Sequence, residues 1–189
     1  MEERSLSVDQ AYLLAGRGTR FPGKFRLSVD GETVVGREVR LLRSLGLAVT
    51  VVSVLPLELP GVRVVRDPFD RGPLGGLATA LAETVAPFFL FGADMPFLDR
   101  DSLSAMRARY RGPALVPIDR SGHWQVLHAI YSGRERAVVE ELLSKGVGLR
   151  GLVEVLQRTG SVELWGPGTV AERSFADIDT PADLARILE

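Results

Sequence analysis

Apolar residues along the chain fall into two patterns, short continuous runs and stretches with helical spacing. The continuous runs, such as residues 11–15 and 86–93, are typical of strands that are covered on both faces. The other pattern occurs over residues 34–45, where apolar side chains recur at near-helical intervals and Gly46 follows as a C-cap. The two patterns alternate, which indicates a protein built from both strands and helices.

The order of these segments predicts the fold class. The predicted strands cover residues 11–15, 48–55, 61–65, 86–93, 114–118, 125–132 and 161–164. The predicted helices cover residues 34–45, 73–85, 101–110, 137–143, 149–156 and 181–188. Strands that alternate with helices favour βαβ units. We therefore expect a single α/β domain over residues 1–189, a three-layer α/β/α sandwich with a mostly parallel, Rossmann-like sheet.

The composition is that of a globular protein, with 46% hydrophobic and 25% charged residues. Lys and Arg number 23 and Asp and Glu 24, so there is no basic excess for general nucleic-acid binding. The first ten residues are polar and unlike a secretory signal, and no apolar run approaches the roughly 20 residues that span a bilayer. We expect a soluble, cytoplasmic protein that binds neither nucleic acid nor membrane.

The residue types present restrict the chemistry. The chain has no cysteine, which excludes thiol catalysis and cysteine-ligated metals. It has only two histidines, which argues against a multi-histidine metal site. A bound metal would take oxygen ligands, and Mg²⁺ is the cation that prefers them together with substrate phosphates.

A glycine-rich basic segment, residues 16–24, directly follows the first predicted strand. Its glycines let the backbone approach a phosphate closely, and Arg20 and Lys24 add positive charge. Ligands bind outside the carboxyl ends of strands in open α/β sheets, so we expect phosphate binding here. The alternative is a flexible, solvated basic turn.

A second glycine-rich segment opens the helix predicted after Asp67. Gly75 and Gly76 lie in its first turn, where each glycine lowers helix stability by about 0.8–1.0 kcal/mol relative to alanine. Such a cost indicates that a ligand or another chain segment approaches the backbone closely. For Gly76, tight packing of the helix against a strand is an equal alternative.

Carboxylates near two element ends are candidate metal ligands. Asp94 ends the most apolar segment, where a carboxylate is costly to bury unless it is paired or metal-bound. We expect it to bind Mg²⁺, with a turn or helix cap as the alternative. Asp177 is a possible second ligand, whereas Asp179 precedes Pro181 and is at least equally suited to cap a helix.

The remaining candidates are an aromatic loop and a strand histidine. His123 and Trp124 lie on a loop and either contact substrate or form an exposed tip. His128 lies inside a predicted strand, and we expect a hydrogen-bonded structural histidine there.

Six short motifs follow one another along nearly the whole chain. They are LAG at residues 14–16, Lys24 with Leu27, Val29 and Gly31, Asp67 with GPLGGL at residues 72–77, DMP at residues 94–96, QVLHAIY at residues 125–131, and FADIDTPADL at residues 175–184. In this order they resemble the motifs of the molybdenum cofactor guanylyltransferases and their nucleotidyltransferase relatives, the MobA-like family.

The resemblance implies a fold of the nucleotide-diphospho-sugar transferase type and a nucleotide site at one end of the sheet. The site residues that it implies are Leu14, Ala15, Gly16 and Lys24 around the nucleotide, Ser53 and Asp67 as further nucleotide contacts, and Asp94 as the Mg²⁺ ligand. Arg20 and Lys24 would neutralise phosphate charge during the reaction.

The implied reaction is transfer of GMP from GTP to molybdopterin, a pterin-type phosphate acceptor, with release of pyrophosphate and Mg²⁺ as cofactor. A transient contact with molybdenum cofactor proteins also follows from the resemblance. One alternative is a related transferase that uses CTP or another phosphorylated acceptor. Another is a nucleotide-binding regulatory protein that has lost catalysis.

The chain departs from the family pattern at two places. Arg17 stands where the family has a second glycine, Gly23 stands where an aspartate precedes the lysine, and the loop between Gly16 and Lys24 is shorter. Asp177 and Asp179 stand where the family usually has asparagine. The first departure bears on the geometry of the phosphate loop, and the second on the metal site or the acceptor.

Overall fold

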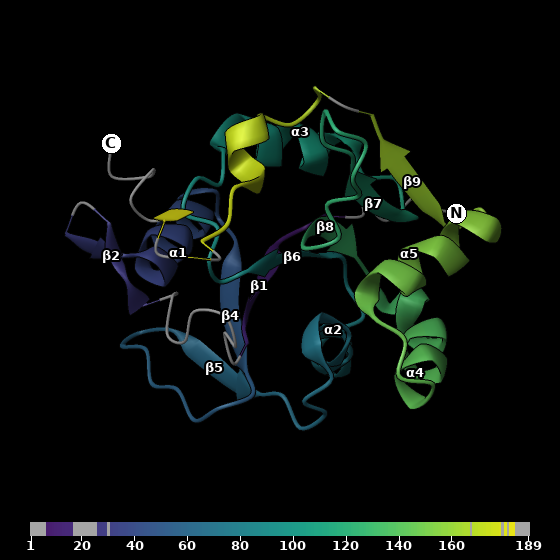
Figure 1. Ribbon diagram of the computed structural model, residues 1–189, viewed down its shortest axis with the longest axis horizontal. Coiled ribbons are helices and arrows are strands. Elements are labelled where there is room, and N and C mark those ends of the chain that lie inside the picture. The colour runs from purple at the N-terminus through teal and green to yellow at the C-terminus, as the bar shows by residue number, and fades with distance from the viewer. Residues whose placement is uncertain are drawn as a thin grey trace.

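A seven-stranded sheet in the order β5-β4-β1-β6-β8-β7-β9 runs through the middle of the molecule (Figure 1). The computed structural model describes residues 7–16, 26–29, 31–166, 168–178, 180 and 182–183. The strands of the sheet are β1 (Gln10–Ala15), β4 (Ala48–Ser53), β5 (Arg63–Arg66), β6 (Phe88–Gly92), β7 (Ala114–Pro117), β8 (His128–Tyr131) and β9 (Val162–Trp165). Strands β2 (Ser28–Val29) and β3 (Glu32–Thr33) form a separate antiparallel pair.

The sheet is mostly parallel, as predicted. Strands β5, β4, β1 and β6 pair in parallel, and so do β7 and β9. Strand β8 lies between β6 and β7 and is antiparallel to both. All strands of the first group therefore end at the same edge of the sheet.

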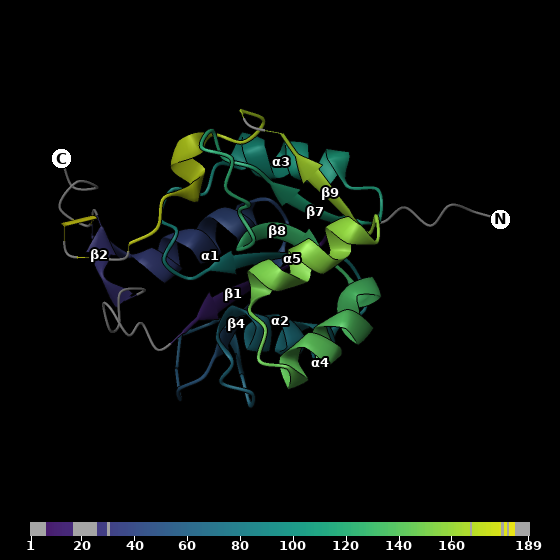
Figure 2. The same cartoon turned by 45° about the vertical axis from the view of Figure 1, so that its right-hand side comes forward.

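Helices cover both faces of this sheet, which makes a three-layer sandwich (Figures 1 and 2). They are α1 (Val34–Ser44), α2 (Gly72–Glu83), α3 (Arg100–Arg109), α4 (Arg136–Ser144) and α5 (Leu149–Arg158), with short 3-10 helices η2 (Gly133–Glu135) and η3 (Glu172–Phe175). One core cluster joins Ala11 and Leu13 of β1 to α1 and α3. The other joins Tyr12 of β1 to α2, α4 and α5. Alternate residues of a strand thus supply the two cores, as the pleat requires.

Helix α2 packs closely against the sheet at Gly76. A Cβ atom at this position would lie 2.7 Å from Cδ1 of Leu14 in β1. The residues of α2 from Leu74 to Leu81 are all buried. Close packing of a helix on a strand therefore accounts for Gly76, which was one of the two alternatives for this glycine.

The structure differs from the predicted elements at the start of β8 and in the β2–β3 pair. The strand expected over residues 125–132 begins only at His128, because the His128 N–H donates to the carbonyl of Gln125 and closes a turn over residues 126–127. The β2–β3 pair was not predicted, since two-residue strands are too short to show periodicity. Of the helix expected over residues 181–188, only Ala182 and Asp183 lie within the described residues.

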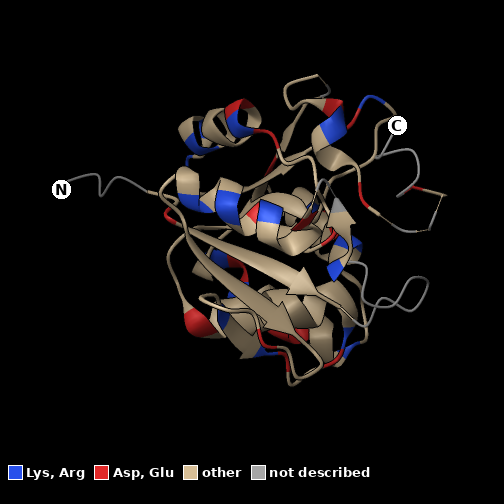
Figure 3. Ribbon diagram, turned by 90° about the vertical axis from the view of Figure 1, so that its left-hand side faces the viewer, with Lys and Arg blue, Asp and Glu red and all other residues tan. Residues whose placement is uncertain are grey.

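Charged residues of both signs are interspersed over the helices and loops, while the central strands are almost free of them (Figure 3). Within the described part of the chain, no helix has the length and apolar character needed to cross a membrane.

Candidate functional site

The carboxyl ends of four neighbouring parallel strands bring most of the predicted site residues to one edge of the sheet. Ala15 of β1 is in register with Ser53 of β4, and Ser53 is in register with Arg66, which precedes Asp67. On the other side of β1, Leu14 is in register with Gly92 of β6. Neighbouring strands lie about 4.8 Å apart, so these positions form a row of roughly 15 Å.

The backbone after β1 is open at Gly16. This glycine is exposed, and a Cβ atom placed on it would meet no atom of the described residues within 4 Å. The carbonyl of Leu14 accepts a hydrogen bond of 3.1 Å from the Ala93 N–H, which ties β1 to the turn after β6. Arg20 and Lys24, predicted to bind phosphate, lie outside the described residues.

Ser53 organises the turn after β4. Its side chain is buried, and its Oγ donates a hydrogen bond of 2.8 Å to the carbonyl of Leu55. Its own carbonyl accepts from the Asp67 N–H at 2.8 Å. The hydroxyl proton is therefore engaged within the fold, and contact of Ser53 with a nucleotide stays a prediction.

Asp67 links the loop after β5 to helix α2. The residue is 4% exposed, and its Oδ1 accepts hydrogen bonds from the Phe69 N–H at 2.8 Å and from Oγ1 of Thr79 at 3.1 Å. A Cβ atom on Gly75 would lie 3.1 Å from Oδ2 of Asp67. Gly75 thus leaves room for this carboxylate, and Asp67 has a structural role that its motif did not reveal.

Asp94 lies in the turn after β6, held next to the C-terminal segment. Its carbonyl accepts a hydrogen bond of 3.0 Å from the Ile178 N–H, and its carboxylate is partly exposed. A Cβ atom on Gly92 would lie only 2.4 Å from Oδ1 of Asp94, so the carboxylate occupies space that glycine leaves open. Helix α3, the next helix along the chain, is capped by Asp99 and not by Asp94.

Asp177 is brought to the same corner, because it directly precedes Ile178. Its side chain is exposed. Asp94 and Asp177 offer the hard oxygen donors that Mg²⁺ prefers, and substrate phosphates supply further oxygens in such sites. In the described residues, no group of three or more histidines, cysteines and carboxylates is arranged to hold a metal ion. Asp179, the other carboxylate considered, lies outside the described residues.

Glu38 is a buried carboxyl group beside this turn, and sequence reasoning missed it. It is 1% exposed, its Oε1 accepts a hydrogen bond of 2.7 Å from the Met95 N–H, and its Oε2 has no partner among the described residues. Burial raises the pKa of Glu38 well above its usual value, the charge of Asp94 adds to this effect, and the Met95 N–H opposes it. The sequence does indicate this burial, because Glu38 lies four residues from both Val34 and Leu42 on the apolar face of α1.

His128 corrects the expectation of a hydrogen-bonded histidine. The side chain is fully buried, but neither ring nitrogen has a hydrogen-bond partner in the part of the chain that is described. Its ring lies edge-on to Phe91 and Phe175, with centroid distances of 5.1 and 5.0 Å. Burial lowers the pKa of His128 to about 3, against a smaller opposing effect of Asp99.

The loop before β8 is arranged around Asp119. Its carboxylate accepts hydrogen bonds from the His123 N–H and from Nε2 of Gln125, both at 2.9 Å. The pKa of Asp119 is lowered, chiefly by the hydrogen bond from the His123 N–H and further by the one from the Ser121 N–H. His123 is exposed, and the guanidinium of Arg150 lies over the ring of Trp124 at 5.8 Å from its centroid.

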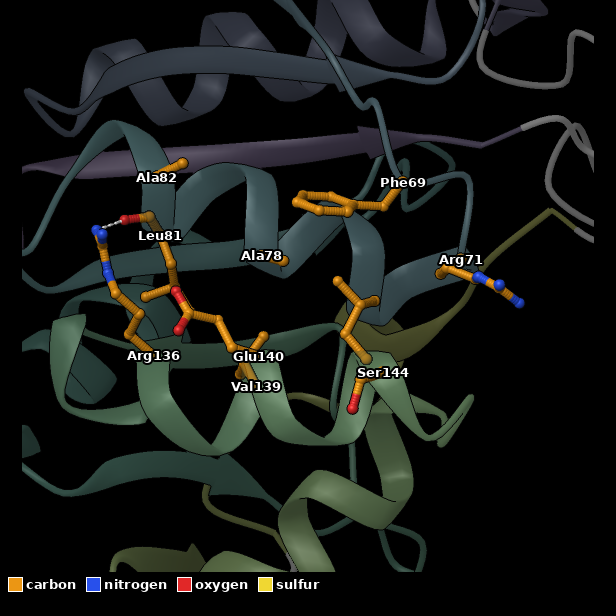
Figure 4. A pocket seen from close by; sticks show the side chains of 10 residues that line it. Phe69, Arg71, Ala78, Leu81, Ala82, Arg136, Val139, Glu140 and Ser144 are labelled. Atoms are coloured by element: carbon orange, nitrogen blue, oxygen red, sulfur yellow. Dashed lines mark hydrogen bonds between the residues drawn. The ribbon is translucent and has the colours of Figure 1, made fainter.

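A pocket of about 400 Å³ lies elsewhere, between α2 and α4 (Figure 4). It is lined by Phe69, Arg71, Ala78, Leu81, Ala82, Arg136, Val139, Glu140, Leu143 and Ser144. None of the predicted site residues is among them. Phe69 connects the pocket to the sheet edge, because its N–H donates to Asp67.

Comparisons with known proteins show the family to which this chain belongs. Residues 11–162 match the family model described as the MobA-like NTP transferase domain. A "Probable molybdenum cofactor guanylyltransferase" of Thermococcus gammatolerans is 31% identical over 146 residues, which cover 72% of this chain and 75% of that protein. The molybdenum cofactor guanylyltransferase of Syntrophotalea carbinolica is 33% identical over 149 residues, covering 75% and 71%.

A solved structure shares the fold. Molybdopterin-guanine dinucleotide biosynthesis protein A from Archaeoglobus fulgidus superimposes with a TM-score of 0.74 at 18% identity, over 94% of this chain and 96% of that one. The structural likeness supports the fold, while the family model matches most of the chain. The chain belongs to the family of the MobA-like NTP transferase domain.

Proposed function

We propose that this protein transfers GMP from GTP to molybdopterin and releases pyrophosphate. The observation that carries the proposal is the row of Gly16, Ser53, Asp67 and Asp94 along the carboxyl edge of β1, β4, β5 and β6. Ligands of open α/β sheets bind at this edge. The choice of guanine and of a pterin acceptor is supported by the names of the curated relatives.

The proposed chemistry is an in-line displacement. A phosphate oxygen of the acceptor attacks the α-phosphorus of GTP, a new P–O bond forms, and the bond to the β-phosphate oxygen breaks. The open backbone at Gly16 would lie against the phosphates, and Arg20 and Lys24 would neutralise their charge. Such a reaction depends on positioning and on charge neutralisation more than on covalent catalysis.

Asp94 and Asp177 are the proposed ligands of Mg²⁺. The space above Gly92 accommodates the carboxylate of Asp94, and both donors are oxygens, so the residues fit this cation. When bound, Mg²⁺ neutralises charge on the phosphate oxygens. The acceptor would lie between the His123 loop and the C-terminal segment. We also propose a cytoplasmic setting and transient contact with molybdenum cofactor proteins.

Thermal-shift measurements with the four nucleoside triphosphates test the guanine assignment. We expect GTP with Mg²⁺ to raise the melting temperature more than ATP, CTP or UTP. A ligand at 100 times its dissociation constant stabilises the native state by about 2.7 kcal/mol, which gives an easily measured shift. Equal shifts for all four would contradict the guanine assignment, and a preference for CTP would make the protein a cytidylyltransferase. Binding of GTP without pyrophosphate release in the presence of molybdopterin would favour the regulatory alternative.

Replacing Lys24 with alanine is expected to weaken GTP binding by about ten- to a hundred-fold. A charge-assisted hydrogen bond to phosphate contributes about 1.5–3 kcal/mol, which corresponds to that factor. Binding of guanosine, which has no phosphate, should be nearly unchanged. Calorimetric titration of both ligands measures the difference, with Lys145→Ala as the matched control because Lys145 is exposed after α4. An unchanged affinity for GTP would show that Lys24 does not reach the phosphates.

A further inference from the structure

The turn after β6 is held from two sides. On one side, the Ile178 N–H donates to the carbonyl of Asp94 at 3.0 Å. On the other side, the Met95 N–H donates to Oε1 of Glu38 at 2.7 Å. The first contact comes from the C-terminal segment and the second from the middle of α1. Two distant parts of the chain therefore hold the carbonyl and the N–H of the peptide unit that joins Asp94 to Met95.

The buried position of Glu38 lowers the stability of the native state. Its side chain is 1% exposed, and its second oxygen has no hydrogen-bond partner among the described residues. Its neighbours on the same face of α1, Val35, Val39 and Leu42, all belong to the apolar core. A buried polar atom without a partner destabilises the native state, so an apolar side chain at this position would stabilise the core more.

The geometry points to Glu38 as a positioning residue for the metal-binding carboxylate of Asp94. This inference rests on the proposed function, because it takes Asp94 as a metal ligand. Glu38 holds the Met95 N–H, which belongs to the peptide unit that follows Asp94, and Gly92 leaves the space that the Asp94 carboxylate fills. Partners that orient a metal ligand typically change metal affinity by about 10–100-fold when they are removed.

Three substitutions and one control test the inference by binding of Mn²⁺, a paramagnetic substitute for Mg²⁺. Free Mn²⁺ is quantified by electron paramagnetic resonance at a fixed GTP concentration, against a protein-free titration that accounts for the Mn²⁺ that GTP binds by itself, so the readout does not depend on turnover. Glu38→Leu removes the acceptor, Glu38→Gln retains an oxygen that can accept from Met95, and Asp94→Asn removes the proposed ligand. Glu38→Met, which is unbranched, replaces the leucine variant if that variant does not fold.

Glu135 provides the matched control. It is also a carboxyl of 1% exposure that accepts from a backbone amide, the Ser132 N–H at 2.6 Å. It follows β8, whose carboxyl end lies beside the start of β6, at the opposite edge of the sheet from Asp94. Glu135→Leu therefore perturbs a comparable buried contact without touching the Asp94 turn.

We expect Glu38→Leu to raise the apparent dissociation constant for Mn²⁺ by at least about tenfold. Glu38→Gln should stay within about threefold of the wild-type value, and Glu135→Leu should leave it unchanged. If Glu38→Leu binds Mn²⁺ as the wild type does while Asp94→Asn does not, the positioning role is overturned and the metal site stands. If Asp94→Asn also binds normally, the metal assignment in the proposed function falls, and the role of Glu38 falls with it. A loss in Glu135→Leu equal to that in Glu38→Leu would overturn the inference as a general effect of stability.

Discussion

Asp94→Asn is expected to reduce the rate of guanylyl transfer by about a hundred- to a thousand-fold. Loss of a metal ligand removes several kcal/mol of charge stabilisation in the transition state, and each 1.36 kcal/mol corresponds to a factor of ten in rate. Asparagine has nearly the same shape as aspartate, so it should fit the space above Gly92. The backbone contact from Ile178 to the Asp94 carbonyl does not involve the side chain and should persist.

The measurement is pyrophosphate release with GTP, molybdopterin and saturating Mg²⁺. Asp101→Asn is the control, because Asp101 is an exposed aspartate in the first turn of α3 and lies outside the Asp94 turn. The melting temperatures of both variants should stay close to that of the wild type. A near-normal rate for Asp94→Asn would mean that this carboxylate is not the metal ligand.

The position of Asp94 was predictable because it follows from the alternation of strands and helices. Parallel strands end at the same edge, so polar residues after the predicted strands 11–15, 61–65 and 86–93 were expected to meet there. The structure places Gly16, Asp67 and Asp94 along that edge. Neither the strand order nor the antiparallel direction of β8 was predicted, since both depend on contacts between distant segments.

The supporting contacts of the site were not predictable in the same way. Glu38 lies 57 residues from Met95, and only the packing of α1 against the turn brings the two together. The structural role of Asp67 depends on Thr79, twelve residues away on α2. In the sequence, such residues can be recognised only as polar groups at apolar positions or as glycines at the ends of elements. The sequence does not show which distant residues they contact.

His128 illustrates how a polar residue in a strand can be read wrongly. The expectation of a hydrogen-bonded histidine assumed that a buried imidazole finds a partner, as most buried polar groups do. Instead, the ring lies between Phe91 and Phe175, and neither nitrogen is hydrogen-bonded within the described residues. Protonation would place an unpaired charge among aromatic rings, so the folded protein favours the neutral form.

This environment predicts that His128 contributes less to the stability of the protein in mild acid than at neutral pH. The pKa of His128 is about 3 in the folded state, while a histidine in the unfolded chain has a pKa of about 6.5. Between these values the unfolded state binds a proton at His128 that the folded state does not, so the contribution of His128 to the free energy of unfolding decreases as the pH falls below about 6.5. From pH 7 to pH 5 the contribution of this residue amounts to about 2 kcal/mol.

Comparison with His128→Leu isolates that contribution. Glu38 and Glu135 have raised pKa values because they are buried, and they change the stability in the opposite direction, which makes the wild-type profile alone ambiguous. Both proteins carry these carboxyls, so their effect cancels in the difference. Urea unfolding at pH 7 and pH 5 should show that lowering the pH destabilises the wild type by about 2 kcal/mol more than the variant. Parallel changes in the two proteins would mean that the His128 imidazole is protonated in the folded state at pH 5, or reaches a partner there that stabilises its charge.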